Sequence, residues 1–394
     1  MKLKMNEEKN LLLIIPNNEI GGAQNFFKRL FKSISSHNKT FYIEDEAVLS
    51  SLTTKPSKNI FHRTWAIYKN IKQLSANGRV TVLATVNSTA PSALCKLLLI
   101  NFYLVSRLGN TLSAEIKTQG IKSYFTRQKQ KLIFFLSDLV VFQSKSMKED
   151  ALKVLELKDS SKFIVINNGI DFAEVSLRSN QAGVMEIDRD YFNFILLGSF
   201  KHQKAYDIFL DAISLIPKGK INEMRFYICG GDVYGDEAYK QFKEGLEQNE
   251  LTDSVFLMGN QDNPYPLLKK MDAYILPSRY EGFPNSLIEA LAFGLPSIVS
   301  RCPGANEEII VKGMNGLTFE NENEAKTNEN KLLLKPQHFI FATNLTHHEE
   351  RCNVPCSHTP DHRKPPPRLP CSIFRYTHQS PSQKLSPLRR AIYS

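Results

Sequence analysis

The sequence predicts an α/β protein with two Rossmann-like domains that face a cleft, followed by a disordered C-terminal tail. Short apolar runs that read as strands alternate with helical stretches in two separate series. At 394 residues, with 42% apolar and 23% charged residues, the chain is long enough for two soluble domains that each bury a core. The last part of the chain has no helical or strand period.

Residues 1–172 form the first predicted domain. Its strand-like runs are "LLLII", "VTVLATV", "LVVFQ" and "FIVIN". Helical stretches separate them, which is the pattern of a parallel sheet covered by helices. Residues 173–190 lose the apolar pattern, and we place the interdomain connection there.

Residues 191–330 form the second predicted domain. Strand-like runs such as "YFNFILLG", "RFYICGG", "SVFLMG", "AYILPS" and "SIVS" again alternate with helical stretches. The apolar runs of the whole chain are too short or too interrupted to span a membrane or to act as a signal peptide. We therefore expect a cytoplasmic protein, peripheral to the inner face of a membrane at most.

Residues 331–394 form the predicted tail, which is rich in Pro, His and Arg. Ten Lys or Arg against three acids give it +7 of the chain's net +10, so the basic character belongs mostly to the tail. We expect a solvated segment rather than a specific nucleic-acid site. Cys352, Cys356, His358 and His362 lack the spacing of a zinc finger, and we predict no metal site.

The stretch "YEGFPNSLIEALAFGLPSIVS" (280–300) places two glutamates around a turn. Glu281 follows a buried strand, and Glu289 lies in the helix that starts after the turn. Gly294 suits a left-handed helix stop and Pro296 ends the helix. In parallel sheets, ligands bind beyond the carboxyl ends of strands, where helix N-termini attract anions.

Each of these glutamates has a structural and a functional interpretation. Ser286 and Glu289 have the spacing of a capping box, in which Glu289 only satisfies the first N–H groups of the helix. Glu281 would then be a solvated loop acid. Alternatively, Glu289 accepts hydrogen bonds from a ribose diol, and Glu281 faces the hydroxyls of a sugar across bound phosphates.

The segment "PSRYEGFPNSLIEALAFGLPSIVS" (277–300) resembles the donor-site signature of glycosyltransferase family 4, a retaining family with the GT-B fold. "LLGSFKHQKAYDIFLDAI" (196–213) is similar to the family's glycine and lysine segment, with Gly198 and Lys204 in register. "NLLLIIPNNEIGGAQNFFKRL" (10–30) resembles its first strand and double-glycine loop. The resemblance covers about residues 10 to 320 and then stops, for which a frameshifted or read-through end is our leading explanation.

The resemblance implies the following donor-side roles. Lys204 would stabilise the leaving diphosphate and Glu281 would contact hydroxyls of the transferred sugar, so both are the candidate catalytic residues. Glu289 would bind the ribose. The family usually has an arginine after the glycine, whereas this chain has Ser199, with Lys201 two positions on. The remaining candidate donor-binding residues are Gly21, Gly22, Gly198, Ser199, Lys201, Gly282, Phe283, Pro284 and Asn285.

The resemblance implies that residues 191–330 are the donor domain, incomplete at its C-terminal end, and that residues 1–172 are the acceptor side, which is less well marked. "RLGNTLSAEIK" (107–117) is similar to a family segment that often carries a histidine, which is missing here, so Arg107 and Asn110 are the candidates. "KTQGIKSYFTRQKQKLIFF" (117–135) follows, with five cations and no acid. It reads either as a solvated helix face or as a surface attracted to an anionic membrane or a lipid diphosphate acceptor.

The resemblance predicts a retaining glycosyltransferase. It would move a hexose or N-acetylhexosamine from a nucleotide-diphosphate sugar, by our interpretation a UDP-sugar, to a saccharide or lipid-linked acceptor in bacterial polysaccharide, lipopolysaccharide or capsule synthesis. It would use no cofactor and no metal, because lysine and helix N-termini supply the positive charge. Two alternatives stay open: a nucleotide-sugar epimerase on the same fold, and a non-catalytic remnant that binds nucleotide-sugar.

Overall fold

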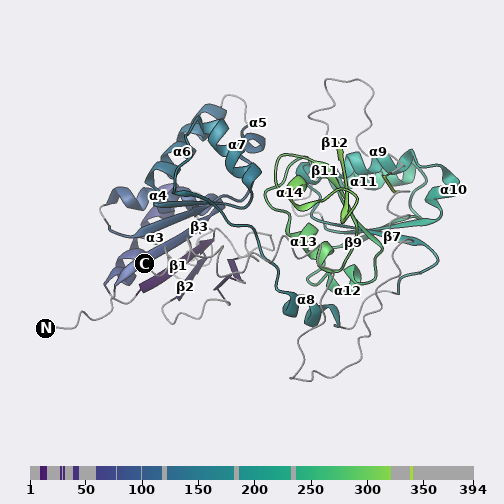
Figure 1. Ribbon diagram of the computed structural model, residues 1–394, viewed down its shortest axis with the longest axis horizontal. Helices are drawn as coiled ribbons and strands as arrows, with labels where there is room; N and C mark the ends of the chain where they lie inside the picture. The colour runs from purple at the N-terminus through teal and green to yellow at the C-terminus, as the bar shows by residue number, and fades with distance from the viewer. Residues whose placement is uncertain are drawn as a thin grey trace. The chain divides into compact units, whose positions relative to one another are not determined.

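The computed structural model describes two compact units that divide after Asn168. Each contains a parallel sheet, for which the described part of the chain supplies six strands, and helices cover the sheets (Figure 1). The described residues are 9–15, 27–28, 30–31, 39–43, 59–76, 78–98, 100–117, 122–181, 186–231, 237–320 and 338–339.

The sheet of the first unit has the order β2-β1-β3-β4-β5-β6. Residues 11–15 of β1 are all buried, because helices cover both faces of a parallel sheet. The strands are β1 Lys9–Ile15, β2 Lys39–Ile43, β3 Arg79–Thr85, β4 Tyr103–Arg107, β5 Leu139–Phe142 and β6 Phe163–Val165. The helices are α3 Ile60–Ser75, η1 Val86–Ser88, α4 Thr89–Leu94, η2 Cys95–Leu98, α5 Leu112–Lys117, α6 Lys122–Leu136 and α7 Lys145–Leu155.

The sheet of the second unit has the order β12-β11-β10-β7-β8-β9. The strands are β7 Phe192–Leu197, β8 Met224–Cys229, β9 Val255–Gly259, β10 Ala273–Leu276, β11 Ser297–Arg301 and β12 Gly316–Glu320. The helices are α8 Phe172–Ser179, η3 His202–Lys204, α9 Tyr206–Ser214, α10 Lys218–Ile221, α11 Glu237–Gln248, α12 Tyr265–Leu268, α13 Asn285–Ala292 and α14 Asn306–Ile309. The two predicted series of strands and helices are therefore confirmed as two parallel α/β sheets.

The predicted connection, residues 173–190, contains a helix. In α8 the side chain of Asp171 accepts hydrogen bonds from the backbone N–H groups of Ala173 at 3.0 Å and Glu174 at 3.1 Å, which caps the helix. Val175 packs into the core of the second unit. One buried apolar residue in two turns is too weak a pattern to predict a helix from sequence.

One residue of the predicted tail belongs to the core of the second unit. Phe339 is fully buried, and its ring packs edge-on against Phe194 and Phe226 at centroid distances of 5.6 and 5.8 Å. A single aromatic residue produces no sequence period, so this contact could not be predicted. Apart from His338 and Phe339, residues 331–394 lie outside the described residues, and the Cys and His residues discussed above lie there as well.

Two general features follow from the described residues. None of their helices is long and apolar enough to cross a membrane. They also contain no cluster of three or more His, Cys, Asp or Glu side chains that could hold a metal ion.

Candidate functional site

The strand order of the second sheet reverses between β7 and β10. Strands β8 and β9 continue to one side of β7, β11 and β12 continue to the other side of β10, and β7 and β10 pair in parallel. Ligands of open α/β sheets bind beyond the carboxyl ends of the strands at such a reversal. Gly198 follows β7 and Glu281 follows β10 by a few residues, so the topology brings the two predicted segments to one place.

Gly198 makes the turn at the end of β7. Its φ is +150°, a region that favours glycine, and its carbonyl oxygen accepts a hydrogen bond from the hydroxyl of Tyr206 at 2.6 Å. A Cβ at this position would lie 2.9 Å from Cε of Lys204. A Cβ on Gly230 would lie only 1.8 Å from the carbonyl oxygen of Gly198. Glycine at position 198 therefore lets the aliphatic part of the Lys204 side chain pack against the backbone. Glycine at position 230 lets the backbone of Gly198 come close.

Lys204 and Glu281 form an ion pair at the carboxyl ends of the two strands. The Nζ atom of Lys204 donates to Oε1 of Glu281 at 2.7 Å, and the hydroxyl of Ser278 donates to the same oxygen at 2.6 Å. The Glu281 side chain is 7% exposed and that of Lys204 is 19% exposed. Glu281 is therefore not the solvated loop acid of the structural interpretation. An ammonium group has three donors, and this pair uses one of them.

Arg279 holds the loop that carries Lys204 against the end of β10. Its guanidinium donates to both carboxylate oxygens of Asp207, at 2.9 and 2.5 Å, and to the carbonyl oxygen of His202 at 3.0 Å. The backbone N–H of Arg279 also donates to the carbonyl of Gln203 at 2.8 Å. Partial desolvation beside Arg279 would by itself raise the pKa of Asp207, but the hydrogen bond and charge of Arg279 outweigh it and lower that pKa.

The turn after Glu281 is held by a second loop. The N–H of Glu281 donates to the carbonyl of Pro303 at 2.9 Å, and the N–H of Ala305 donates to the carbonyl of Gly282 at 3.0 Å. A Cβ at Gly304 would lie 2.3 Å from the carbonyl oxygen of Glu281, so this approach requires glycine. Gly282, Phe283 and Pro284 are buried, and Phe283 packs into the core below the turn.

Helix α13 starts at Asn285 and has no side-chain cap. The hydroxyl groups of Ser286 and Tyr274 lie 2.8 Å apart, and Oε1 of Glu289 accepts a hydrogen bond from the Tyr265 hydroxyl at 3.1 Å. Because Pro284 is the N-cap and Ser286 lies inside the helix, the capping box of the structural interpretation is not formed. Tyrosines from β10 and α12 contact both side chains, and local sequence does not predict these contacts.

The other predicted donor residues lie partly within the described chain. Ser199 and Lys201 are half-buried in the loop between β7 and η3, the same loop that carries Lys204. Gly21 and Gly22 lie outside the described residues. The contacts thus unite Gly198, Lys204, Glu281 and Gly282, with Glu289 on the helix that follows.

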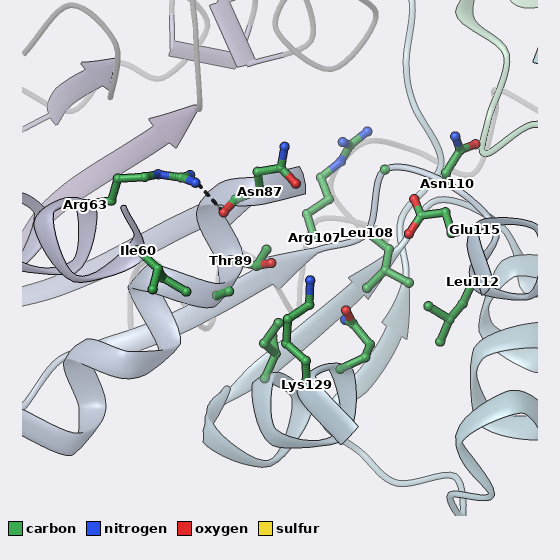
Figure 2. A pocket seen from close by; sticks show the side chains of 14 residues that line it. Ile60, Arg63, Asn87, Thr89, Arg107, Leu108, Asn110, Leu112, Glu115 and Lys129 are labelled. Carbon is green, nitrogen blue, oxygen red and sulfur yellow. Dashed lines mark hydrogen bonds between the residues drawn. The ribbon is translucent and has the colours of Figure 1, made fainter. Parts of the chain in front are cut away.

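A polar cavity of about 200 Å³ lies in the first unit, beyond the carboxyl ends of β3 and β4 (Figure 2). Arg107 and Asn110, the two predicted acceptor residues, both line it. Further polar side chains come from α3, from the segment after β3, from α5 and from α6. They are Arg63, Asn87, Thr89, Glu115, Lys129 and Gln130.

Arg107 is buried at the end of β4 and is oriented by amide side chains. Its Nη2 donates to Oδ1 of Asn168 at 2.7 Å, and Asn168 donates in turn to Oε1 of Gln143 at 3.0 Å. The guanidinium carbon lies 5.9 Å from the centroid of the Phe27 ring. Desolvation lowers the pKa of Arg107 to about 9, so an anion in the cavity would stabilise its charged form.

Several residues that line the cavity were missed from sequence. Asn87 and Thr89 directly follow the strand β3, and their position after a strand was a usable signal. Arg63 lies within a long helix and donates to the backbone carbonyl of Asn87 at 3.0 Å (Figure 2). Desolvation raises the pKa of Glu115, and the charge of Lys129 opposes that shift. No sequence pattern marks Arg63 or Glu115 as neighbours of Arg107.

Comparison with solved structures identifies the arrangement of the chain. HepE of Anabaena, in complex with UDP, superposes with a TM-score of 0.58 at 15% identity, over 86% of this chain and 95% of that chain. The lipopolysaccharide outer core galactosyltransferase WaaB in its apo form superposes with a TM-score of 0.58 at 18% identity, over 87% and 96% of the two chains. The chain has the GT-B fold.

Sequence comparison agrees with this fold. Residues 191–333 match the family model described as glycosyl transferases group 1. The O-antigen biosynthesis glycosyltransferase WbnH of Escherichia coli is 24% identical over 79% of this chain and 86% of its own length. These matches support a glycosyltransferase of the GT-B fold, and they favour neither the epimerase nor the non-catalytic remnant.

Proposed function

We propose that the chain is a retaining glycosyltransferase that moves a hexose or N-acetylhexosamine from a UDP-sugar to a saccharide or lipid-linked acceptor in bacterial surface polysaccharide synthesis. The buried Lys204–Glu281 pair at the reversal of the second sheet carries this proposal. A further relative supports the choice of substrates. A UDP-Gal:alpha-D-GlcNAc-diphosphoundecaprenol alpha-1,3-galactosyltransferase of Escherichia coli is 31% identical over 40% of this chain and 41% of its own.

Lys204 supplies the positive charge for the departing diphosphate. Lys204 lies in the chain between the end of β7 and the start of α9, whose N-terminal N–H groups also favour an anion. The loop that carries it is held by Arg279, so the charge is in place before the reaction begins. Because lysine and helix N–H groups provide the charge, the proposed reaction uses no metal and no further cofactor.

Glu281 orients the transferred sugar through hydroxyl groups rather than attacking it. Oε1 of Glu281 already accepts hydrogen bonds from Lys204 and Ser278, which lowers the nucleophilicity of the carboxylate. We therefore favour attack on the front face. The bond from the anomeric carbon to the diphosphate breaks, the acceptor oxygen bonds to the anomeric carbon on the same face, and the acceptor proton passes to the leaving phosphate.

Glu289 binds the ribose in this proposal. Tyr265 is buried under α13 and its hydroxyl fixes one carboxylate oxygen of Glu289. A carboxylate held in this way can accept hydrogen bonds from a diol with little loss of side-chain entropy. Gly282, Phe283, Pro284 and Asn285 would line the path between the ribose and the sugar.

The cavity of the first unit receives the acceptor in this proposal. Arg107 and Asn110 lie there with Arg63 and Lys129, so its walls carry three cations and one carboxylate, that of Glu115. This balance favours an acceptor that bears a phosphate or another anion over a neutral sugar.

Calorimetric titration of UDP into the full chain tests the donor site without knowledge of the acceptor. We expect binding that is lost in Glu289→Ala and retained in Glu244→Ala, because Glu244 is an exposed acid on α11. Turnover is then measured as UDP release from UDP-glucose and UDP-galactose with phosphate-bearing acceptors. Failure of the folded full chain to bind UDP, or equal binding by both variants, would overturn the proposal.

A further inference from the structure

Helix α6 exposes large apolar side chains on the side that faces away from the sheet. Tyr124, Phe125, Leu132 and Phe135 are all exposed, and the ring of Phe135 is 78% exposed. At roughly 100° per residue, these four positions fall within an arc of about 100° on the helix. This arc lies opposite Ile133 and Phe134, which are buried in the core. The helix is therefore apolar on both sides.

Helix α3 carries a second exposed aromatic group. Phe61 is 77% exposed and Trp65, one turn further along, is 53% exposed. The Trp65 ring stacks on Tyr68 at a centroid distance of 5.1 Å, and the ammonium of Lys69 lies 5.8 Å from the Trp65 ring. The indole is thus held by neighbours on its own helix rather than covered by the core.

These two helices flank the same cavity. Ile60 and Arg63 line it from α3, while Lys129 and Ile133 line it from α6 (Figure 2). Helix α4 packs against both α3 and α6. The exposed aromatic residues therefore belong to two helices that border the same cavity and pack on the same short helix. We call Phe61, Trp65, Tyr124, Phe125, Leu132 and Phe135 the aromatic face.

The charge on the two helices is of one sign. Neither helix contains an Asp or Glu. Their basic side chains are Arg63, Lys69, Lys72, Lys122, Arg127, Lys129 and Lys131. Aromatic rings interleaved with Lys and Arg suit the boundary between lipid headgroups and acyl chains, where rings enter the apolar layer and cations remain with anionic headgroups.

We propose that the aromatic face docks the protein on the surface of an anionic lipid bilayer. The rings of α3 and α6 insert among the headgroups, and the surrounding cations pair with lipid phosphates. This binding needs no donor and no glycosyl transfer, so it goes beyond the proposed function and is tested apart from it. It would also bring the cavity beside the headgroups, within reach of acceptors anchored in the membrane.

The chain provides its own probe, because Trp65 is its only tryptophan. Vesicles of phosphatidylglycerol and phosphatidylcholine are added to the full-length protein, and vesicles of phosphatidylcholine alone serve as the comparison. We expect the Trp65 emission to shift to shorter wavelength, and to be quenched by brominated acyl chains, only with the anionic vesicles. Unchanged emission with protein bound to the vesicles would overturn the proposal, because another part of the chain would then be responsible.

Sedimentation with the same vesicles tests the rest of the face. Phe125→Ser combined with Phe135→Ser should lower the partition coefficient at least about tenfold, because two exposed rings are removed. Lys122→Gln combined with Arg127→Gln should lower it about fivefold for each charge. Leu177→Ser combined with Leu215→Ser is the matched control, since both leucines are exposed in the second unit, and it should bind like the unchanged protein.

Two results would overturn the assignment. Equal sedimentation of the Phe125/Phe135 variant and the control would show that another basic segment, such as residues 331–394, binds the vesicles. If instead light scattering showed that this variant turns a dimer into a monomer, and the unchanged protein ignored the vesicles, the face would contact a second copy of the chain. All substituted side chains are exposed, and circular dichroism checks that each variant is folded.

Discussion

The two candidate binding regions are built in different ways. In the second unit, backbone groups and short side-chain contacts from the ends of β7 and β10 surround the Lys204–Glu281 pair, and glycines allow their close approach. In the first unit, long side chains from α3, α5, α6 and two strand ends line an open cavity. The contacts in the second unit leave the charged groups little freedom to move. In the first unit, the shape and charge of the cavity change when any one lining side chain is exchanged.

This difference fits the tasks proposed for the two regions. Stabilisation of a departing diphosphate requires charges that are fixed before the reaction, since reorganisation would reduce their effect. Recognition of an acceptor varies between enzymes and can be altered by exchanging side chains on a constant frame. Substitutions around Lys204 should therefore affect stability and turnover together, and substitutions in the cavity should affect acceptor binding alone.

The largest effect is expected from breaking the buried ion pair. Lys204→Met leaves the Glu281 carboxylate buried without its ammonium, and should destabilise the fold by about 3–5 kcal/mol. It should also lower kcat by about 100- to 1,000-fold, because positive charge is lost at the leaving group. Urea unfolding and UDP release measure the two effects.

The double variant Lys204→Met with Glu281→Gln separates these two effects. Removal of both charges should restore much of the stability but none of the turnover. If the single variant were as stable and active as the unchanged protein, the pair would have neither role.

A smaller loss of stability is expected at the turn after β7. Gly198→Ala places a Cβ 2.9 Å from Cε of Lys204 at a φ of +150°, so we expect destabilisation of about 1–3 kcal/mol and weaker UDP binding. Gly169→Ala is the matched control, because a Cβ there meets nothing within 4 Å. Equal melting temperatures for the two variants would show that the turn relaxes without strain.

The contact between Arg279 and Asp207 predicts a pH-dependent effect. The folded-state pKa of Asp207 is below its ordinary value of 3.8, so the stability it contributes is present above pH 3.8 and is lost as the pH falls through the lower folded value. Asp207→Asn should destabilise the protein at neutral pH by no more than about 1 kcal/mol, since Asp207 is largely exposed.

Unfolding measured across pH checks this prediction. The stability curves of Asp207→Asn and the unchanged protein should converge in acid. The exposed control Glu244→Gln should follow the unchanged protein throughout. If the free energies of unfolding of the Asp207 variant and the unchanged protein differed by the same amount at all pH values, the charge of the carboxylate would not contribute to its contact with Arg279.

The smallest effect is expected in the cavity of the first unit. Arg63→Ala and Lys129→Ala should each raise KM for a phosphate-bearing acceptor about three- to tenfold, because one of three cations is lost. The affinity for UDP and the stability should not change. Lys72→Ala, on α3 but not among the residues that line the cavity, is the control for kinetics measured without vesicles. Weaker UDP binding in the cavity variants would contradict the separation of the two regions.

The sequence by itself determined the features that depend on local pattern. Runs of apolar residues such as 11–15 must be buried on both faces, which predicts parallel sheets under helices. Gly294 adopts the left-handed conformation expected of a helix stop, with a φ of +74°. The positions of Gly198, Lys204 and Glu281 just after strands likewise follow from the sequence.

Tertiary structure alone decided the contacts between residues far apart in the chain. Helix α13 begins at Asn285, so Ser286 is not at the N-cap and the locally plausible capping box does not form. Glu289 and Ser286 contact Tyr265 and Tyr274. Phe339 fills the core of the second unit from a segment that shows no sequence period. A local pattern states which partners a side chain could have, but the folded chain decides among them, because only there do distant groups compete for the same hydrogen bond or the same space.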